Sequence, residues 1–263
     1  MPQWAAFVGL TGFLLTVLLA LSHLSQQALS AGSDRTPEKR IYPRFETPEA
    51  ARQRRHLSDQ LRPELSTGAL LANVALTQGV FGVLLLGGAF LFAVPASALG
   101  VTDGALSTGL PAVAVGIGAG VGFWTGNELA SVVADGIGIT VDESVRELLT
   151  PASAAGWVVL LGAVLPTIAV VEELLFRAAA IGVPVAGLGA PPWLMVPLAA
   201  AAFALGHGAQ GRVGVAVTGI LGVALGALFV VTNSLLAVAV AHYLINALEL
   251  VVHEGPGVQR LVG

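Results

Sequence analysis

Long apolar runs separated by short polar breaks dominate the pattern of this 263-residue chain. The first run, residues 4–24, has about the 20 residues that a helix needs to cross a bilayer. Since it lacks a basic start and a clear small-residue cleavage site, it predicts an anchor helix rather than a signal peptide. Further apolar runs cover residues 68–95 and 109–133, and the chain after residue 151 is almost continuously apolar. The pattern predicts an all-α fold, a polytopic membrane helix bundle with about seven spanning helices.

Composition indicates the same class of protein. Hydrophobic residues make up 55% of the chain and charged residues only 11%, against about 25% charged in a soluble domain. The absence of cysteine excludes disulfide bonds, a thiol nucleophile and a Cys-ligated metal. The polar breaks divide the chain into five regions: an N-terminal anchor helix at 1–26, a cytoplasmic polar loop at 27–67 with a surface helix over 47–65, membrane helices and an interfacial segment at 68–150, a core membrane region at 151–252, and a C-terminal tail at 253–263.

Orientation follows from the basic residues, because Lys and Arg are enriched in cytoplasmic loops. Eight of the 12 lie in the polar loop: Arg35, Lys39, Arg40, Arg44, Arg52, Arg54, Arg55 and Arg62. We therefore expect a multi-pass protein of the cell membrane with its N-terminus outside and its C-terminus cytoplasmic. The bilayer is the expected partner of this loop. A nucleic acid is not, since six acidic residues nearly balance its positive charge.

The apolar run at residues 152–187 is too long for one spanning helix. Its 36 residues would extend about 54 Å at 1.5 Å per residue, against a hydrocarbon core of about 30 Å. Pro166 lies inside the run, and proline breaks a helix interior but suits the first turn of a new helix. We expect a break near Pro166, with residues 152–165 as a re-entrant piece and a spanning helix beginning at Pro166.

Ionisable and amide side chains within these apolar runs are the main candidates for chemistry. An ionisable group in hydrocarbon costs several kcal/mol or more, so such residues usually mark a functional site. A break at Pro166 would place them at similar depth in the inner half of the membrane. The candidate site residues are Glu172, Glu173, Arg177, His207, His242 and Asn246.

Helical spacing divides these residues into groups. Glu173 and Arg177 are four positions apart and can form an ion pair on one face. Glu172 is rotated by about 100° from Glu173 and projects elsewhere. His242 and Asn246 share a face of the last helix. One carboxylate is thus neutralised by arginine, and the other is available for chemistry.

The three motifs resemble one known family. Glu172-Glu173-xxx-Arg177, Phe203-xxx-His207 and His242-xxx-Asn246, in this order on successive apolar helices, are similar to the CPBP family of type II CAAX prenyl endopeptidases and Abi proteins. The similarity covers about residues 150–252 and makes region 151–252 a CPBP/Abi-like protease core. Ala178 stands where many members have a glycine, and the helices of region 68–150 carry no family motif.

The resemblance implies an intramembrane endopeptidase that acts on membrane-associated peptide or protein substrates. Glu172 with His207 would activate a water, His242 and Asn246 would stabilise the oxyanion, and Glu173 with Arg177 would hold the site in shape. The preferred mechanism requires no cofactor. The alternative is a divalent metal such as zinc, whose ligands would be Glu172, His207, His242 and Asn246.

Two other functions remain open on the sequence. A non-catalytic immunity or regulatory protein of the same family would keep the fold and bind a partner peptide. A small proton-coupled transporter would also place Glu, His and Arg at membrane depth, but we expect it to contain two related halves with matching broken helices. His23, His56 and His253 are expected at interfaces, and Asn127 with Glu128 at a helix end. The glycines between residues 114 and 126 are expected to allow close helix packing.

Overall fold

The fold of this protein is described by a computed structural model at residues 1–33, 67–138 and 144–255. These residues form helices without a strand, so the all-α prediction is confirmed for them. The surface helix expected over residues 47–65 and most of the expected tail lie outside the described residues. The main helices are α1 (Trp4–Ser33), α3 (Thr67–Leu91), α5 (Leu110–Gly136), α10 (Pro192–Gly206), α11 (Gly211–Thr232) and α12 (Leu235–Glu254), with the long helix α7–α9 between α5 and α10.

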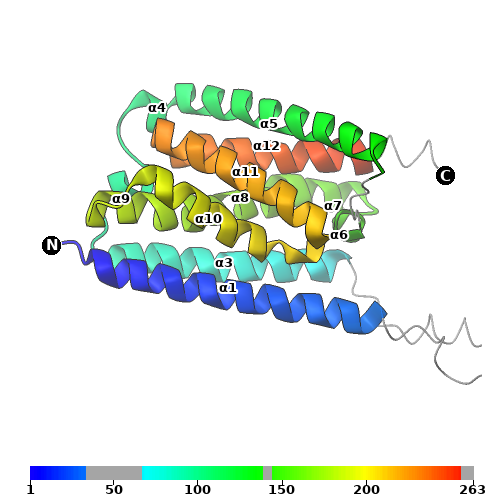
Figure 1. Cartoon of the computed structure of the whole chain (residues 1–263), viewed down its shortest axis with the longest axis horizontal. Coiled ribbons are helices and arrows are strands. Elements are labelled where there is room, and N and C mark those ends of the chain that lie inside the picture. The colour runs from blue at the N-terminus through cyan, green and yellow to red at the C-terminus, as the bar shows by residue number, and fades with distance from the viewer. Residues whose placement is uncertain (34–66, 139–143, 256–263) are drawn as a thin grey trace, which may run out of the picture.

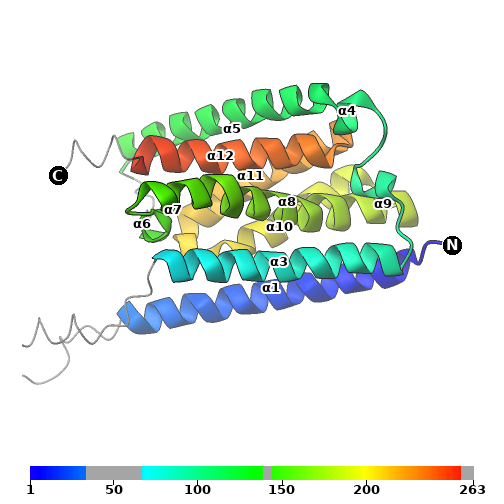
Figure 2. The same ribbon diagram turned by 180° about the vertical axis from the view of Figure 1, so that it is seen from behind.

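Five helices of the described chain are long and apolar enough to cross a membrane. They cover residues 4–27, 67–91, 154–188, 208–232 and 235–254. Figures 1 and 2 show them side by side in one bundle, together with α5 and the shorter α10. The protein is therefore a multi-pass membrane protein, and about seven spanning helices remain a prediction. Helix α1 begins at one end of the bundle and α12 ends at the other (Figure 1).

The expected break at Pro166 is wrong. Residues Ala154–Leu188 form one continuous helix of 35 residues, which passes through Pro166 without a re-entrant piece. It contains α7 (Ala154–Val159), α8 (Leu165–Glu173) and α9 (Val183–Leu188), joined by two π-helical segments, Leu160–Val164 and Leu174–Gly182.

The first π-helical segment accounts for the tolerated proline. Val164 and Leu165 keep right-handed helical backbone angles. A π turn directly before Pro166 widens the helix where the ring of a proline would otherwise meet the carbonyl four residues earlier. At 1.5 Å per residue the helix extends about 52 Å, beyond a core of about 30 Å. Tilt and protrusion accommodate such an excess.

The long helix lies at the centre of the bundle. Every residue from Val171 to Ile181 is buried, and α1, α3, α10, α11 and α12 all pack against α8 or the π-helical segment that follows it. A helix that is buried all round is a core helix. The ionisable side chains of this segment therefore face protein rather than lipid.

Short segments connect the helices at both ends of the bundle. At one end, the 3₁₀ turn Ala96–Leu99 and helix α4 (Ala105–Thr108) lie between α3 and α5, and at the other end helix α6 (Ser144–Leu149) precedes the long helix. A 3₁₀ turn, Gly208–Gln210, joins α10 to α11. The two helices that carry His207 and His242 are thus fixed by short connections.

Close packing of α5 on α12 depends on two glycines. A Cβ at Gly116 would lie 2.6 Å from the backbone oxygen of Ala237, and a Cβ at Gly120 would lie 2.9 Å from that of Ala241. Small residues four positions apart allow this backbone approach in membrane helices. The expected packing role is confirmed for these two. The other glycines meet nothing within 4 Å: Gly118, Gly122 and Gly126.

Replacement of Gly120 by valine is expected to destabilise the protein, because α12 has to move away from the new side chain. Overpacking of this kind costs about 1–3 kcal/mol. Thermal unfolding in detergent measures the loss. The matched control is Gly118→Val, on the same helix with nothing within 4 Å of its Cβ position. An equal loss in both variants would contradict the close approach at Gly120.

Candidate active site

Two neighbouring carboxylates lie at the junction of α8 and the second π-helical segment. Glu172 is 8% exposed, and Glu173 is fully buried. Because successive residues of a helix are rotated by about 100°, the two side chains reach different partners. Each carboxylate therefore has a separate role in the site.

Glu173 is shared by a guanidinium and an imidazole. Its Oε1 accepts hydrogen bonds from Arg177 Nη1 at 2.7 Å and from His242 Nδ1 at 2.7 Å. Arg177 also donates to the backbone oxygen of Gly222 at 3.3 Å, and its guanidinium lies 4.6 Å from the ring centroid of Phe203. The predicted ion pair is present, and its contact with His242 was not anticipated. These contacts offset the desolvation that a buried ion pair must overcome.

Glu172 uses its two oxygens differently. Oε1 accepts a hydrogen bond from Gln78 Nε2 of α3 at 3.1 Å. Oε2 is buried and has no hydrogen-bond partner among the described residues. It lies 3.7 Å from His242 Nε2 and 4.0 Å from His207 Nε2. Both distances exceed the 2.7–3.2 Å typical of a direct hydrogen bond, so the carboxylate oxygen faces both rings without binding either.

The hydrogen bonds of the two histidines fix which nitrogen faces Glu172. His207 Nδ1 lies 2.8 Å from the backbone oxygen of Phe203, and His242 Nδ1 faces the carboxylate of Glu173. Both partners accept hydrogen bonds only, so each Nδ1 carries the proton. In the neutral rings both Nε2 atoms then hold lone pairs. The two lone pairs face Glu172 Oε2.

His207 is positioned by the end of a short helix. It follows α10 directly, and its backbone has left the helical region, with φ −100° and ψ 21°. The ring of Phe203, one turn earlier, lies 4.5 Å from the imidazole of His207, centroid to centroid. Ser22 of α1 donates to the backbone oxygen of Gly206 at 2.8 Å. The N-terminal helix thus holds the end of the helix that carries His207.

Five of the six predicted site residues are joined by these contacts, and the sixth is not. Asn246 lies one turn after His242 on α12 and is partly exposed. Among the described residues its carboxamide makes no hydrogen bond to the others. The expected proximity of Glu172 to His207 and His242 is confirmed. This proximity was predicted from a break at Pro166, but it does not require one. The continuous helix also brings Glu172 close to both histidines.

The donor types around Glu172 are those found in zinc sites. Zinc sites commonly combine imidazole nitrogens with a carboxylate oxygen. A histidine that binds a metal usually donates its other N–H to an oxygen, as both His207 and His242 do here. Glu172 Oε2, without a hydrogen-bond partner, faces both Nε2 atoms. Glu172, His207 and His242 would be the ligands of such an ion. Among the described residues, however, the set whose three ligand atoms lie within 4.8 Å of one another is Glu128, Glu249 and His253.

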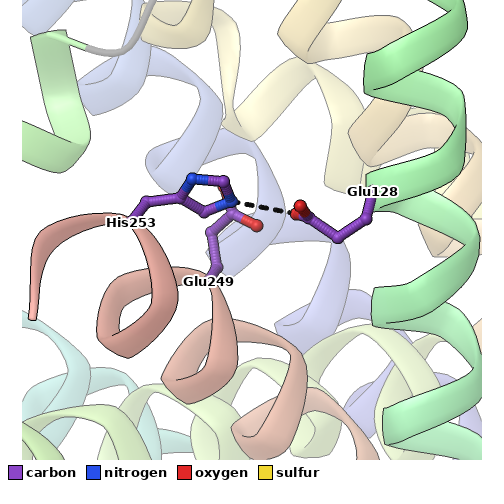
Figure 3. Close-up of side chains that lie close together, drawn as sticks. All are labelled: Glu128, Glu249 and His253. Carbon is purple, nitrogen blue, oxygen red and sulfur yellow. Dashed lines mark hydrogen bonds and ion pairs between the residues drawn. The ribbon is translucent and has the colours of Figure 1, made fainter. Parts of the chain in front are cut away.

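A second polar cluster joins α5 to α12 away from this site (Figure 3). His253 Nε2 lies 3.0 Å from Glu128 Oε1 and 3.9 Å from Glu249 Oε1. Arg146 of α6 binds Glu249 at 2.8 Å and Glu254 at 2.9 Å. The sequence predicted His253 at an interface and Glu128 at a helix end. It did not predict the contact between these two residues. The cluster joins three helices, α5, α6 and α12, through ion pairs and hydrogen bonds. Arg146 is its permanently charged cation.

Fold and site together define a multi-pass membrane protein with a candidate reaction centre buried between its helices. Residues 154–248 match the family described as type II CAAX prenyl endopeptidase Rce1-like. Residues 154–248 therefore form a domain of this CAAX protease type, as the motifs predicted, and the match suggests an intramembrane protease. No curated protein and no solved structure matched the chain. The matched residues include all six predicted site residues and leave out α1, α3 and α5.

The two glutamates are expected to differ in their effect on stability. Glu173→Gln leaves Arg177 without its anionic partner in a buried site, which we expect to cost about 3 kcal/mol. Glu172→Gln removes a charge that pairs with no arginine and should cost less. Thermal unfolding of both variants in detergent measures the difference. Equal losses would contradict the division of roles between the two carboxylates.

Proposed function

We propose that this protein is an intramembrane endopeptidase that hydrolyses peptide bonds of membrane-associated peptide or protein substrates. One observation supports the proposal most strongly. The buried Oε2 of Glu172 has no hydrogen-bond partner among the described residues and faces Nε2 of both His207 and His242. A carboxylate and an imidazole directed at one point suit the activation of a water.

Glu172 and His207 act as the base of the reaction. A water held between Glu172 Oε2 and His207 Nε2 loses a proton to this pair as its oxygen attacks the carbonyl carbon of the substrate. The tetrahedral intermediate then breaks its C–N bond, and the same pair returns the proton to the leaving amine. One water and one peptide bond thus give a carboxylic acid and an amine.

His242 and Asn246 stabilise the oxyanion of the intermediate. His242 donates through Nε2–H when its ring carries both protons, and the carboxylate of Glu173 stabilises that cation through Nδ1–H. Asn246 adds an amide donor one helical turn further along α12. Donors that are fixed in a water-poor site and directed at the developing charge contribute most to such stabilisation. Arg177 acts through Glu173 and does not meet the substrate.

This mechanism requires no metal, although the same donor types occur in zinc sites. With zinc, Glu172, His207 and His242 would hold the ion, and Asn246 is the fourth candidate ligand. A bound ion would supply Lewis-acid chemistry and lower the pKa of its water. The hydrogen bonds from Nδ1 of each histidine would orient the rings in either case.

We place the N-terminus outside the cell and the C-terminus in the cytoplasm. Helix α6, which contains Arg146, and the beginning of α11, which contains Arg212, lie at the end of the bundle where α1 ends. Basic residues favour the cytoplasmic side. The substrates of a protein in this orientation are peptide segments in or next to the membrane.

Glu172→Ala and His207→Ala are each expected to abolish proteolysis while the protein stays folded and inserted. A general base contributes about 10²- to 10⁴-fold to the rate, so cleavage should fall to the background. The measurement is cleavage of a membrane-peptide library by the purified protein, with and without a chelator. His23→Ala is the matched control, because this histidine is exposed on α1 and bonds only Gln27 in the described structure.

Full activity in either site variant would rule out this mechanism. Loss of activity with the chelator, restored by added zinc, would replace the metal-free version by the metal version. Tight binding of library peptides without any cleavage would instead support a non-catalytic member of the family.

A further inference from the structure

A helix outside the family domain contributes a hydrogen bond to the proposed base. Gln78 lies on α3, whereas the matched domain begins at residue 154. Its Nε2 donates to Glu172 Oε1 at 3.1 Å. The motifs of the family give no sign of this contact, because it joins two residues 94 positions apart.

The amide side chain of Gln78 is unusual in a helix as apolar as α3. The helix is apolar enough to span a membrane, with a mean hydropathy of 2.0, and an unpartnered amide is costly in hydrocarbon. Gln78 is only partly buried, and Glu172 is its one hydrogen-bond partner among the described residues. A packing role alone would be served better by an apolar side chain.

The close packing of α3 on α8 sets the distance between Gln78 and Glu172. Gly82, one turn after Gln78, is buried, and a Cβ there would lie 3.0 Å from Val171 Cγ2. Phe81 and Leu85 of the same helix belong to the buried core. The backbone that carries Gln78 is therefore held against the helix that carries Glu172.

The hydrogen bond selects which carboxylate oxygen can react. A carboxylate accepts hydrogen bonds at both oxygens, and here Oε1 is occupied by Gln78. Oε2 is left to face the two histidine Nε2 atoms. Without Gln78 the carboxylate could rotate about its terminal bond, because a sp³–sp² torsion has a broad, nearly two-fold profile.

We infer that Gln78 is a positioning residue for Glu172: it holds Oε1 so that Oε2 stays directed at the activated water. The inference rests on the proposed function. It means that the family domain by itself does not complete the reaction centre, and that α3 supplies a necessary part of it. Gln78 does not touch the substrate in this role and acts only through Glu172.

The first test separates kcat from KM. Gln78→Met keeps the length of the side chain and removes its donor, so kcat should fall about 10- to 100-fold, the range found for hydrogen-bond partners of site residues. KM should stay unchanged, because substrate binding is not affected. The matched control is Asn73→Leu, which removes the other amide of α3; Asn73 is exposed and should leave both constants unchanged.

The second test does not depend on activity. Thermal unfolding of the full-length protein in detergent is measured for Gln78→Met, for Glu172→Met and for the double variant. If Gln78 acts through Glu172, the shifts of Tm are not additive, and the double variant resembles Glu172→Met. Contacting residues couple in this way, whereas distant ones give additive effects.

The outcomes distinguish this inference from the proposed function. A wild-type protein that cleaves no library peptide refutes the proposed function, and with it the positioning role of Gln78 in catalysis, while the unfolding cycle still reports on the contact. An active wild-type protein with an unchanged kcat in Gln78→Met overturns the inference alone. So does a raised KM without loss of kcat, or a fall in kcat with additive shifts of Tm.

Discussion

The geometry of the site depends on one carboxylate oxygen, Oε1 of Glu173, which binds both Arg177 and His242. A charge in a fully buried position is tolerated only with a partner and hydrogen bonds, and Arg177 supplies both. That neutralised anion is then strong enough as an acceptor to hold His242 Nδ1 at 2.7 Å. The ring of His242 is thereby fixed with Nε2 toward Glu172. Glu172, Glu173 and Arg177 all belong to the long helix. Helix α12 packs directly on α8, and α5 in turn approaches α12 closely at Gly120.

An apolar surrounding explains why the polar residues of this protein occur in groups. No water in the hydrocarbon core satisfies a lone polar side chain, and several in the described helices are placed beside another. Glu172 has Gln78, and Glu128 has His253. Oε2 of Glu172 is one of four buried side-chain atoms of the described residues without a hydrogen-bond partner, and it faces Nε2 of two histidines. An unsatisfied acceptor in an apolar setting lowers the stability of the folded protein. Such unfavourable features persist mainly at functional sites.

The sequence predicted the ion pair within one helix and, through its motifs, the proximity of Glu172 to both histidines, but it missed other contacts between helices. Apolar runs of about 20 residues located α1 and α3, and the four-residue spacing predicted the pair of Glu173 with Arg177. Hydropathy and proline rules suggested a break at Pro166, but a π turn is set by packing and leaves no mark in an apolar run. Gln78 and Glu128 were both visible as polar residues in apolar helices. Their partners lie 94 and 125 positions away, and no spacing rule along one chain relates such residues.

The end of the short helix α10 positions the side chain of His207. The 15 residues of this helix extend about 22 Å, less than a core of about 30 Å. The last carbonyls of a helix have no partner within it, and leaving them unsatisfied in hydrocarbon would be costly. The hydroxyl of Ser22 satisfies that of Gly206, and Nδ1 of His207 satisfies that of Phe203. The same hydrogen bond that completes the helix end therefore sets the tautomer of His207 and directs its Nε2 at Glu172.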